Sequence, residues 1–377
     1  MMLMMSAFVP ILLLPFLLLM IDPCVCFSAT VPRRSTPVLF PSEAGDPVHL
    51  QFDVGCVANP VVLLPSSLDQ DSKWQMYYYG NAGSWNHEIK CFLPTGWSGL
   101  AESDDGLTWT KIPGSHTDGS VLGPSEDDWD CVQTGVSDVV RINSKESHMY
   151  YFGADKEEIS MGPGSIAGFR MRIGRAKSYD QGRTWIKDKG YLLDYDSSEG
   201  LFASWPRIML PQEQGDPWSM LYHAFDGQKW RVFGAKSTDQ GDSWTRTGLV
   251  LEGGTSEDAF DFGGIGTRTV TPWRDGWLMI YEGVAKSGTH CLGAAYCDKS
   301  LTSAWTKLND GKSILEPGKG PMGDWCSQVI GTPFVVALPD QSLRLYHCGK
   351  DGPDGKMRIG VVESKSGDIS PESWKAI

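Results

Sequence analysis

The 377-residue chain carries 46 acidic and 33 basic side chains, so its formal net charge is −13. This excess of negative charge, with no Lys/Arg-rich run to offset it locally, excludes an extended nucleic-acid-binding surface. The 15 tryptophans, 12 tyrosines, 43 glycines and 23 prolines supply a large core and many tight turns. A neutral polyhydroxylated ligand suits such an acidic, aromatic-rich protein better than a polyanion does.

Residues 1–26 resemble a signal peptide. The stretch from Ala7 to Ile21 is apolar and uncharged, and Cys24 and Cys26 stand at −3 and −1 to a cut before Phe27, although a basic leading region is missing. The apolar run is too short for a comfortable membrane span, and no other segment approaches its length. We therefore expect the chain to enter the secretory pathway and to be free of the membrane once the signal is removed.

Residues 27–45 have the composition of a transit segment or of a disordered tail. The stretch is rich in Ser, Thr and Pro, contains Arg33 and Arg34, and has no acidic residue before Glu43. It resembles the bipartite presequence of algae with complex plastids, in which a Phe follows the signal cleavage site. A plastid destination and an extracellular one both stay open.

Five tryptophans close five copies of one pattern between Phe52 and Ile377: Trp109, Trp185, Trp244, Trp305 and Trp374. Each copy contains an apolar run, a tyrosine-bearing run, a small-residue run and the segment that ends in tryptophan. The alternation in WQMYYYG (74–80) has the period of two that is typical of strands. We predict an all-β domain over residues 46–377, a five-bladed β-propeller with four antiparallel strands per blade and almost no helix. Because no linker interrupts the repeats, we expect one domain. We also expect a monomer.

A turn motif, S-x-D-x-G-x-[ST]-W, links the third and fourth runs at Ser178–Trp185 and at Ser237–Trp244, and a weaker copy contains Asp104 and Trp109. The Asp can accept hydrogen bonds from its own turn, the Gly can adopt a positive φ, and the Trp can fill the gap between neighbouring blades. We interpret this motif as scaffold.

Cysteine gives little information about the site. Seven cysteines remain after removal of the signal peptide, which excludes a fully paired disulfide framework. Cys56, Cys131 and Cys326 lie just ahead of the first strands of their units, where a soft metal could bind. The alternative is that they are small buried apolar residues. No CxxC or HxxxH spacing supports a set of metal ligands. We predict no metal site from them.

At the first strands the chain resembles a known family. Residues 264–284, GIGTRTVTPWRDGWLMIYEGV, are similar to the GIG-x-x-P…DGWLLIYHG pattern of the β-mannoside phosphorylase group of glycoside hydrolases, and GVSDVVRI (135–142) is similar to that group's GVEDPRI. The wider superfamily is the five-bladed propeller of arabinanases, invertases and levansucrases. The resemblance runs from Phe52 to Trp374 and implies a propeller fold and activity on a saccharide.

The departures from this family concern its catalytic acids. The hydrolases carry acidic residues in blades one, two and three, whereas this chain has Asn59 in blade one, keeps Asp138 in blade two and has Trp205 in blade three. Glycoside hydrolysis needs two carboxyl groups across the scissile bond, and an Asn cannot take a proton from water. On this alignment the usual hydrolytic pair is lost, and Asn59 and Trp205 become candidate substrate-binding residues beside a catalytic Asp138.

A second set of acids precedes the first strand of every unit: Asp53, Asp130, Glu199, Asp261 and Asp324. If these carboxylates ringed the channel mouth, they would raise one another's pKa or recruit a cation such as Ca²⁺. We predict Glu199 and Asp53 as catalytic partners of Asp138, and Asp261 as a substrate-binding residue. The alternative is structural, with each acid accepting hydrogen bonds where the chain enters a blade.

Further polar side chains are expected at the same mouth. Arg207 and Arg268 follow first-strand anchors and could hold a phosphate or carboxylate, as cationic residues do in the phosphorylase group. His223, Glu282 and His347 occupy matched places on the second strands, where an acid–base or binding role competes with a core role.

These residues predict a carbohydrate-active enzyme of the glycosyl hydrolase type that acts on a neutral saccharide by hydrolysis or phosphorolysis. Asp138 would act with Glu199 or with a bound anion, and no organic cofactor is expected. One alternative is a non-catalytic propeller that binds a glycan or a protein. Another is an enzyme of different small-molecule chemistry on the same fold, because one fold hosts many functions.

Overall fold

The computed structural model describes residues 35–66, 72–83, 91, 93–161, 164–211, 213, 215–298, 305–352 and 355–377. Contacts group Arg33–Ile377 into one compact unit, and the expected signal peptide, 1–26, lies outside the described residues. Apart from 3₁₀ turns, the secondary structure of the described residues is entirely β. The 3₁₀ turns are η1 (Gln51–Asp53), η2 (Asn309–Gly311), η3 (Asp324–Cys326) and η4 (Pro371–Ser373). No helix in the described part of the chain has the length and apolarity to cross a membrane.

The first half of the chain forms two four-stranded antiparallel sheets and one small hairpin. One sheet has the order β2-β3-β4-β5, and its strands are β2 (Cys56–Leu63), β3 (Trp74–Asn81), β4 (Gly96–Ser103) and β5 (Thr110–Ile112). The next has the order β6-β7-β10-β11, with β6 (Gln133–Arg141), β7 (Ser147–Ala154), β10 (Arg172–Ser178) and β11 (Ile186–Lys187). The hairpin consists of β8 (Ile159–Met161) and β9 (Gly164–Ile166).

The following eight strands form one sheet made of two antiparallel runs. The first run is β12 (Ser204–Met209), β13 (Trp218–Phe225), β14 (Trp230–Ser237) and β15 (Thr245–Glu252). The second run is β16 (Gly264–Trp273), β17 (Gly276–Val284), β18 (His290–Asp298) and β19 (Thr306–Lys307). The runs meet through β14 and β16 in one parallel pair, Trp230 with Gly264.

The last sheet combines both ends of the described chain. It has the order β1-β22-β21-β20, and β23 also pairs with β22; the strands are β1 (Pro37–Leu39), β20 (Val329–Ala337), β21 (Leu343–Lys350), β22 (Arg358–Ser364) and β23 (Trp374–Ala376). An N-terminal strand thus joins the sheet built by the C-terminal strands.

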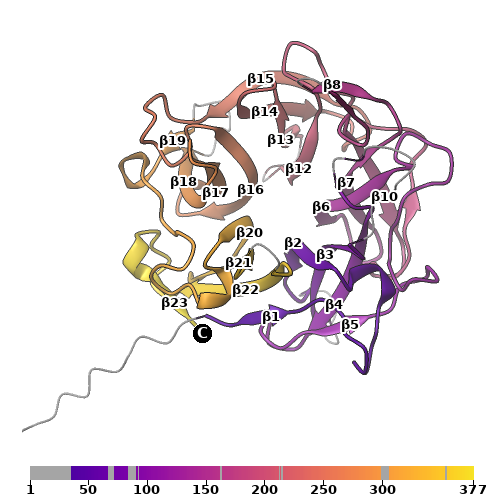
Figure 1. The fold of residues 1–377 in the computed structure, drawn as a ribbon, viewed down its shortest axis with the longest axis horizontal. Helices are drawn as coiled ribbons and strands as arrows, with labels where there is room; N and C mark the ends of the chain where they lie inside the picture. The colour runs from indigo at the N-terminus through magenta and orange to yellow at the C-terminus, as the bar shows by residue number, and fades with distance from the viewer. Residues whose placement is uncertain are drawn as a thin grey trace, which may run out of the picture. The chain divides into compact units, whose positions relative to one another are not determined.

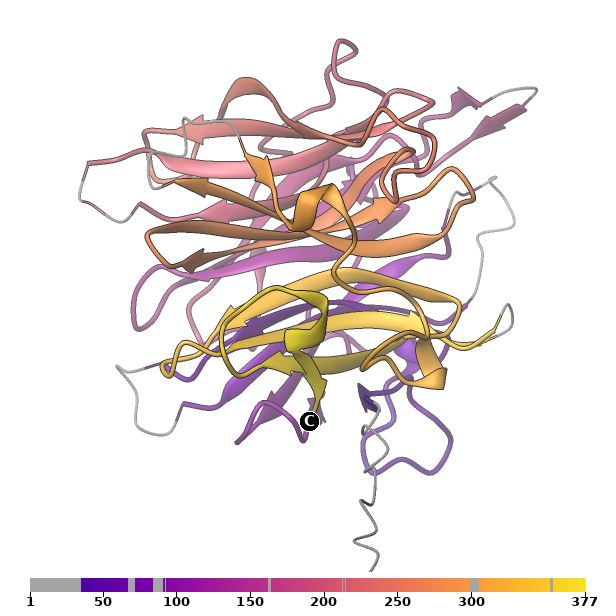
Figure 2. The same ribbon diagram turned by 90° about the vertical axis from the view of Figure 1, so that its left-hand side faces the viewer.

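The sheets are arranged around a common centre. In Figure 1 the strands β2, β6, β12, β16 and β20 lie nearest the middle of the view, and the strands β5, β10, β15, β19 and β23 lie toward the rim. Figure 2, turned by 90°, shows the sheets as successive layers. The prediction of an all-β architecture is confirmed. The sheet pairing gives sets of four, four, eight and five strands with one hairpin rather than five equal sets.

The turn motif acts as the expected scaffold. In the copy at Ser178–Trp185, Asp180 accepts hydrogen bonds from Thr184, and the Trp185 ring meets Tyr77 of the preceding sheet edge to face at a centroid distance of 5.6 Å. In the weaker copy the acid that organises the turn is Asp105, which accepts from the Leu107 and Thr108 amides, and not Asp104. The reason is that this copy lacks one residue between its Asp and its Gly.

The segment ahead of residue 46 is packed against the sheets. The Ser35 side chain is 2 % exposed, its amide donates to Pro321 O at 2.8 Å, and its carbonyl accepts from Trp325 Nε1 at 3.1 Å. Ser42 donates its amide to Asp53 Oδ1 at 3.2 Å. The compact unit therefore begins ahead of the predicted boundary at residue 46. Residues 27–34 of the predicted transit segment or tail lie outside the described residues, so that assignment stays a prediction.

Candidate functional site

Each of the five innermost strands carries one extra residue relative to its partner at the same point along the strand. These bulges lie between Ala58 and Val61, Val136 and Asp138, Ser204 and Arg207, Ile265 and Arg268, and Gly331 and Phe334. Asn59, Trp205 and Thr332 adopt positive φ at three of them, with values of 50°, 49° and 43°. Bulges turn side chains out of the regular alternation. Most of the predicted site residues lie at or beside these bulges, and we call this set of positions on the inner strands the bulge level.

Asp138 is one of two acids among these residues, and its pKa is raised. It is 7 % exposed, and its Oδ1 accepts from the Val139 amide at 2.9 Å while its Oδ2 accepts from the Ile208 amide of the next sheet at 2.7 Å. Arg207 NH1 lies 4.0 Å from Oδ1. Burial raises the pKa of Asp138 to about 6, against the opposing effects of Arg207 and the two amides. The carboxyl group can therefore carry a proton close to neutral pH.

Two buried guanidinium groups face this acid from the next two inner strands. Arg207 donates from Nε to Arg268 O at 2.6 Å, and Arg268 donates to the carbonyls of Gly266 and Leu221, each at 3.1 Å. Burial lowers the pKa of Arg207 to about 10, and burial together with Arg207 lowers the pKa of Arg268. Within the described residues, Arg207 NH1 and Arg268 Nε have no hydrogen-bond acceptor. Arg207 pairs with Asp138, and the unpartnered donors of the two guanidinium groups are suited to an anionic ligand.

His223 and Trp205 stand beside the arginines. His223 Nδ1 lies 3.1 Å from Arg268 NH1, and its ring centroid lies 5.1 Å from that of Trp205. Burial and the neighbouring Arg268 lower the pKa of His223 to about 3, so the imidazole stays neutral over the physiological range. His223 Nε2 and Trp205 Nε1 also find no hydrogen-bond partner among the described residues. His223 is thus suited to neutral hydrogen bonding and not to acid–base work near pH 7.

Asn59 and Glu282 also lie at the bulge level, and Thr332 connects them. The backbone amide of Asn59 donates to Thr332 Oγ1 at 3.1 Å, and the Thr332 amide donates to Glu282 Oε2 at 3.2 Å. Burial raises the pKa of Glu282, but the bonds from His290, Thr267 and Thr332 outweigh it and hold the pKa below its usual range. Glu282 therefore remains a carboxylate. Thr332 and His290 were not predicted, although Thr332 precedes Pro333 just as Asn59 and Trp205 precede Pro60 and Pro206.

These contacts close a circuit around the centre. Asn59 Nδ2 in β2 donates to Val136 O in β6, and the Ile208 amide in β12 donates to Asp138 in β6. Arg207 in β12 donates to Arg268 O in β16. On the other side, the Thr332 amide in β20 donates to Glu282 in β17, and Thr332 Oγ1 accepts from the Asn59 amide in β2. Asp138 is thus both an acid and a connection between two sheets.

Aromatic and apolar side chains fill the space next to this circuit. Phe152 and Trp205 lie 4.2 Å apart by ring centroids, and Phe225 stacks on Trp230 at 4.6 Å. They belong to one cluster that also includes Tyr79 and Cys348. The polar residues of the level, namely Asn59, Asp138, Arg207, Arg268, His223 and Glu282, are all at most 8 % exposed. Little of each of these side chains is therefore exposed to a ligand in this structure.

His347 does not join this group of contacts. It is fully buried, stacks on Trp325 at 5.3 Å and directs Nδ1 to Cys348 O. Burial lowers the pKa of His347 to about 4. Its surroundings match the core role that was the alternative for the second-strand histidines.

The second set of acids has a repeated structural role in four of five cases. Each carboxylate accepts a hydrogen bond from a tyrosine on the second strand of its own run. It also forms an ion pair with a lysine or arginine on the outermost strand of that run. The sets are Asp53 with Tyr78 and Lys111, Asp130 with Tyr151 and Lys187, Glu199 with Tyr222 and Arg246, and Asp261 with Tyr281 and Lys307. We call each set a carboxylate clamp. The fifth acid, Asp324, lies in η3.

The clamps account for the repetition of these acids without catalysis. Asp53, Glu199 and Asp261 contact partners within their own runs, whereas Asp138 contacts Arg207 and the Ile208 amide of the neighbouring sheet. Across the described residues, no group of three or more His, Cys, Asp or Glu side chains could hold a metal ion, so the acids do not form a Ca²⁺ cage there. The seven cysteines at and after Cys56 are all free thiols.

Comparison with known proteins supports the fold. No protein-family profile matches the chain, and no curated protein matches its sequence. Solved structures do match, among them a thermostable family-43 glycoside hydrolase with 16 % identity and a TM-score of 0.59, over 86 % of this chain and 94 % of the other. A glycosyl hydrolase from Bacteroides ovatus matches with 15 % identity and a TM-score of 0.57, over 88 % of this chain and 93 % of the other. A β-1,2-mannobiose phosphorylase from Listeria innocua, in complex with β-1,2-mannobiose, matches with 15 % identity and a TM-score of 0.62, over 88 % of this chain and 96 % of the other. The predicted resemblance to propeller glycoside hydrolases and mannoside phosphorylases is confirmed for the fold.

Proposed function

We propose that this protein is a carbohydrate-active enzyme that splits a neutral saccharide with phosphate, using Asp138 as the acid. The observation that carries the proposal is the group of Asp138, Arg207 and Arg268: one buried carboxyl with a raised pKa beside two guanidinium groups whose NH1 and Nε atoms have no acceptor among the described residues. The similar solved structures include a phosphorylase as well as hydrolases, which agrees with either reaction on this fold.

We further propose that the ring consists of five four-stranded blades. The eight-stranded sheet then counts as two blades, because its halves meet in one parallel pair, Trp230 with Gly264. The sheet that contains β20 to β23 is the fifth blade, with β1 as an added strand. The same bulge in each of β2, β6, β12, β16 and β20 supports five equivalent inner strands.

The chemistry favours phosphorolysis over hydrolysis because the two reactions need different groups. Hydrolysis with inversion needs a second carboxylate to take a proton from water. Phosphate is itself a competent nucleophile and needs cationic donors that hold its oxygens. Here Asn59 and Trp205 stand where further acids would be expected, while Arg207 and Arg268 supply unused donors. The site thus combines the raised-pKa acid Asp138 with two arginines, Arg207 and Arg268, that form a cationic cradle. The other carboxylate of the site, Glu282, is already engaged by His290, Thr267 and the Thr332 amide.

The proposed step balances with these groups. A phosphate oxygen attacks the anomeric carbon while the glycosidic C–O bond breaks, and the Asp138 proton passes to the departing sugar oxygen. The products are a glycosyl phosphate and the shortened saccharide, and Asp138 regains a proton from solvent. A pKa of about 6 leaves part of the Asp138 population protonated at neutral pH. The Trp205 ring offers a flat apolar face to the sugar.

The test is a panel of neutral oligosaccharides, incubated with and without inorganic phosphate, with chromatography of the products. We expect turnover that requires phosphate and is lost in Asp138→Asn. Turnover that proceeds equally without phosphate would show hydrolysis and remove the cationic cradle from the mechanism. Full activity in Asp138→Asn would remove the acid.

A second candidate function is a non-catalytic glycan-binding propeller. It is favoured by one observation, the nearly complete burial of Asp138, Arg207 and Arg268 beneath an aromatic cluster. Saccharide binding without any turnover across the panel, unchanged by Asp138→Asn, would support this candidate over the enzyme.

A further inference from the structure

One of the four carboxylate clamps departs from the repeat. Asp53, Asp130 and Asp261 are at most 1 % exposed, and each pairs with a lysine at 2.5 to 2.7 Å. Glu199 is instead 8 % exposed and pairs with the Nε of Arg246 at 3.2 Å. A glutamate has one more methylene group than an aspartate, so its carboxylate extends further from the chain. In a repeated architecture, such a local exception marks a place where something other than the scaffold is selected.

A hollow opens at this exception. Its volume is about 560 Å³, inside the range of roughly 300–1,000 Å³ that is typical of small-molecule sites. Its walls come from the segment before β10, from the chain before β12, from the turn between β13 and β14, and from the strands β14 and β15. The lining side chains that matter are Arg170, Tyr195, Glu199, Asp226, Arg231 and Leu249.

Glu199 offers this hollow an acceptor. Its Oε2 accepts from Tyr222 at 2.7 Å and from Arg246 at 3.2 Å. Its Oε1 receives no hydrogen bond from any residue that the structure describes, and Glu199 lines the hollow. A carboxylate that is held by one oxygen and open at the other is suited to accept a hydroxyl hydrogen from a ligand.

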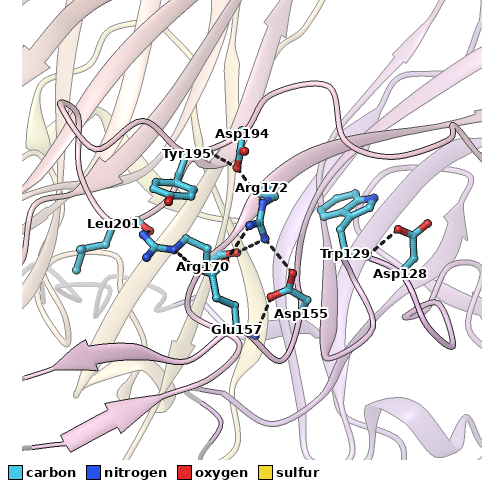
Figure 3. Close-up of polar contacts among 9 residues, drawn as sticks. All are labelled: Asp128, Trp129, Asp155, Glu157, Arg170, Arg172, Asp194, Tyr195 and Leu201. Carbon is cyan, nitrogen blue, oxygen red and sulfur yellow. Dashed lines mark hydrogen bonds and ion pairs between the residues drawn. The ribbon is translucent and has the colours of Figure 1, made fainter.

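The walls are held in place by contacts of their own. Arg170 donates from Nε to Glu157 at 3.1 Å and from NH1 to Leu201 O at 3.0 Å, and its guanidinium carbon lies 3.9 Å from the centroid of the Tyr195 ring. Figure 3 shows Arg170 between Glu157 and the Tyr195 ring, with Arg172 fixed beside it by Asp155, Glu157 and Asp194. A site whose side chains are already oriented loses less entropy on binding.

The charge and polarity of the lining indicate the class of ligand. The two arginines, Arg170 and Arg231, are balanced by two acids, Glu199 and Asp226, so the hollow has no net charge to attract an ion. Arg231 is also paired with Asp226 and Glu252. Leu249 is 52 % exposed and adds an apolar patch to this polar lining. Hydroxyl partners beside a small apolar face fit a neutral sugar ring.

We propose that this hollow is a saccharide-binding site separate from the Asp138 group. One sugar hydroxyl donates to Glu199 Oε1, other hydroxyls meet the arginine and aspartate edges, and the C–H face of the ring packs against Leu249. The site binds without chemistry, because Glu199 is its one open carboxylate: the second acid of the lining, Asp226, is engaged by the Gln228 and Lys229 amides and by Arg231. Binding here does not depend on phosphorolysis at Asp138.

The test is performed with the full-length protein carrying Asp138→Asn, without phosphate, so that the catalytic proposal cannot affect the result. An array of neutral and anionic oligosaccharides identifies a ligand, and isothermal titration calorimetry measures its Kd. We expect a neutral glycan to bind, Leu249→Asp to weaken it at least tenfold, and Glu199→Gln to weaken it as well. The matched control is Ile186→Asp, because Ile186 is 65 % exposed on the outer strand of the neighbouring sheet and lies outside the hollow.

Three results would overturn the proposal: no neutral glycan on the array binds, anionic glycans bind in preference, or Leu249→Asp and Ile186→Asp bind with equal affinity. Leu249 is exposed, so its replacement should leave folding intact and the comparison remains valid if Glu199→Gln fails to fold.

Discussion

Asp138 should make the folded protein less stable as the pH rises, and Asp138→Asn should remove that effect. An ordinary aspartate has a pKa of 3.8, whereas burial raises the pKa of Asp138 to about 6 in the folded protein. Between these values the native state binds a proton that the unfolded state does not. Stability from this group is therefore present below pH 3.8 and is lost as the pH rises through 6. The difference corresponds to about 3 kcal/mol.

The measurement is urea unfolding, followed by tryptophan fluorescence, at several pH values from 4.5 to 7.5. Because other groups also titrate, the informative quantity is the difference in unfolding free energy between the wild type and Asp138→Asn. We expect the wild type to lose about 2 kcal/mol relative to the variant over this range, since part of the effect is already lost at the lowest pH. The substitution also lowers the free energy of unfolding by an amount that does not depend on the titration of Asp138. Asn has an NH2 group in place of one carboxyl oxygen, so either the Val139 or the Ile208 amide loses its acceptor and about 1–3 kcal/mol is lost.

Asp239→Asn is the matched control. Hydrogen bonds from Ser243 lower the pKa of Asp239 to about 2, so this acid is ionised in both folded and unfolded states over most of the same pH range. Its difference from the wild type should stay nearly constant. A pH-independent difference for Asp138→Asn, or one of opposite sign, would refute the reasoning: it would mean that Arg207 and Arg268 outweigh burial and that Asp138 cannot act as an acid near neutral pH.

Three further predictions follow from the same contacts. Tyr78→Phe should cost about 1–3 kcal/mol in urea unfolding, because the fully buried Asp53 loses a hydrogen bond of 2.8 Å, whereas loss of less than about half a kcal/mol would argue against the carboxylate clamp. Arg207→Met should raise the KM for phosphate at least tenfold in a turnover assay, and an unchanged KM would place the anion elsewhere. N-terminal sequencing of the native protein should find a start ahead of Ser35, since a cut after Ser42 would delete β1; a mature start at Glu43 would contradict this.

The all-β architecture could be predicted from the sequence, and so could the proximity of three residues of the candidate site. The alternation of WQMYYYG and the tryptophan repeat identify strands directly, and Asp138, Arg207 and Arg268 do lie together. These features can be inferred from sequence because strand period is local, and because one bulge recurs at the same point of each inner strand.

The remaining features depend on contacts between distant residues. Asp53 and Asp138 both look like acids near an inner strand, and only the positions of Lys111 and Tyr78 separate a clamp from a catalytic group. The neutral state of His223 likewise follows from its burial beside Arg268, which no sequence spacing reveals. The extended start of the compact unit depends on pairing between β1 and β22, at opposite ends of the described chain.

The most direct test of phosphorolysis at Asp138 is to follow ³¹P NMR during turnover of a neutral oligosaccharide in ¹⁸O-labelled water. We expect a new glycosyl phosphate resonance, no ¹⁸O in the released sugar, and loss of the resonance in Asp138→Asn. A released sugar that carries ¹⁸O from water, with the phosphate signal unchanged, would contradict phosphorolysis and indicate hydrolysis.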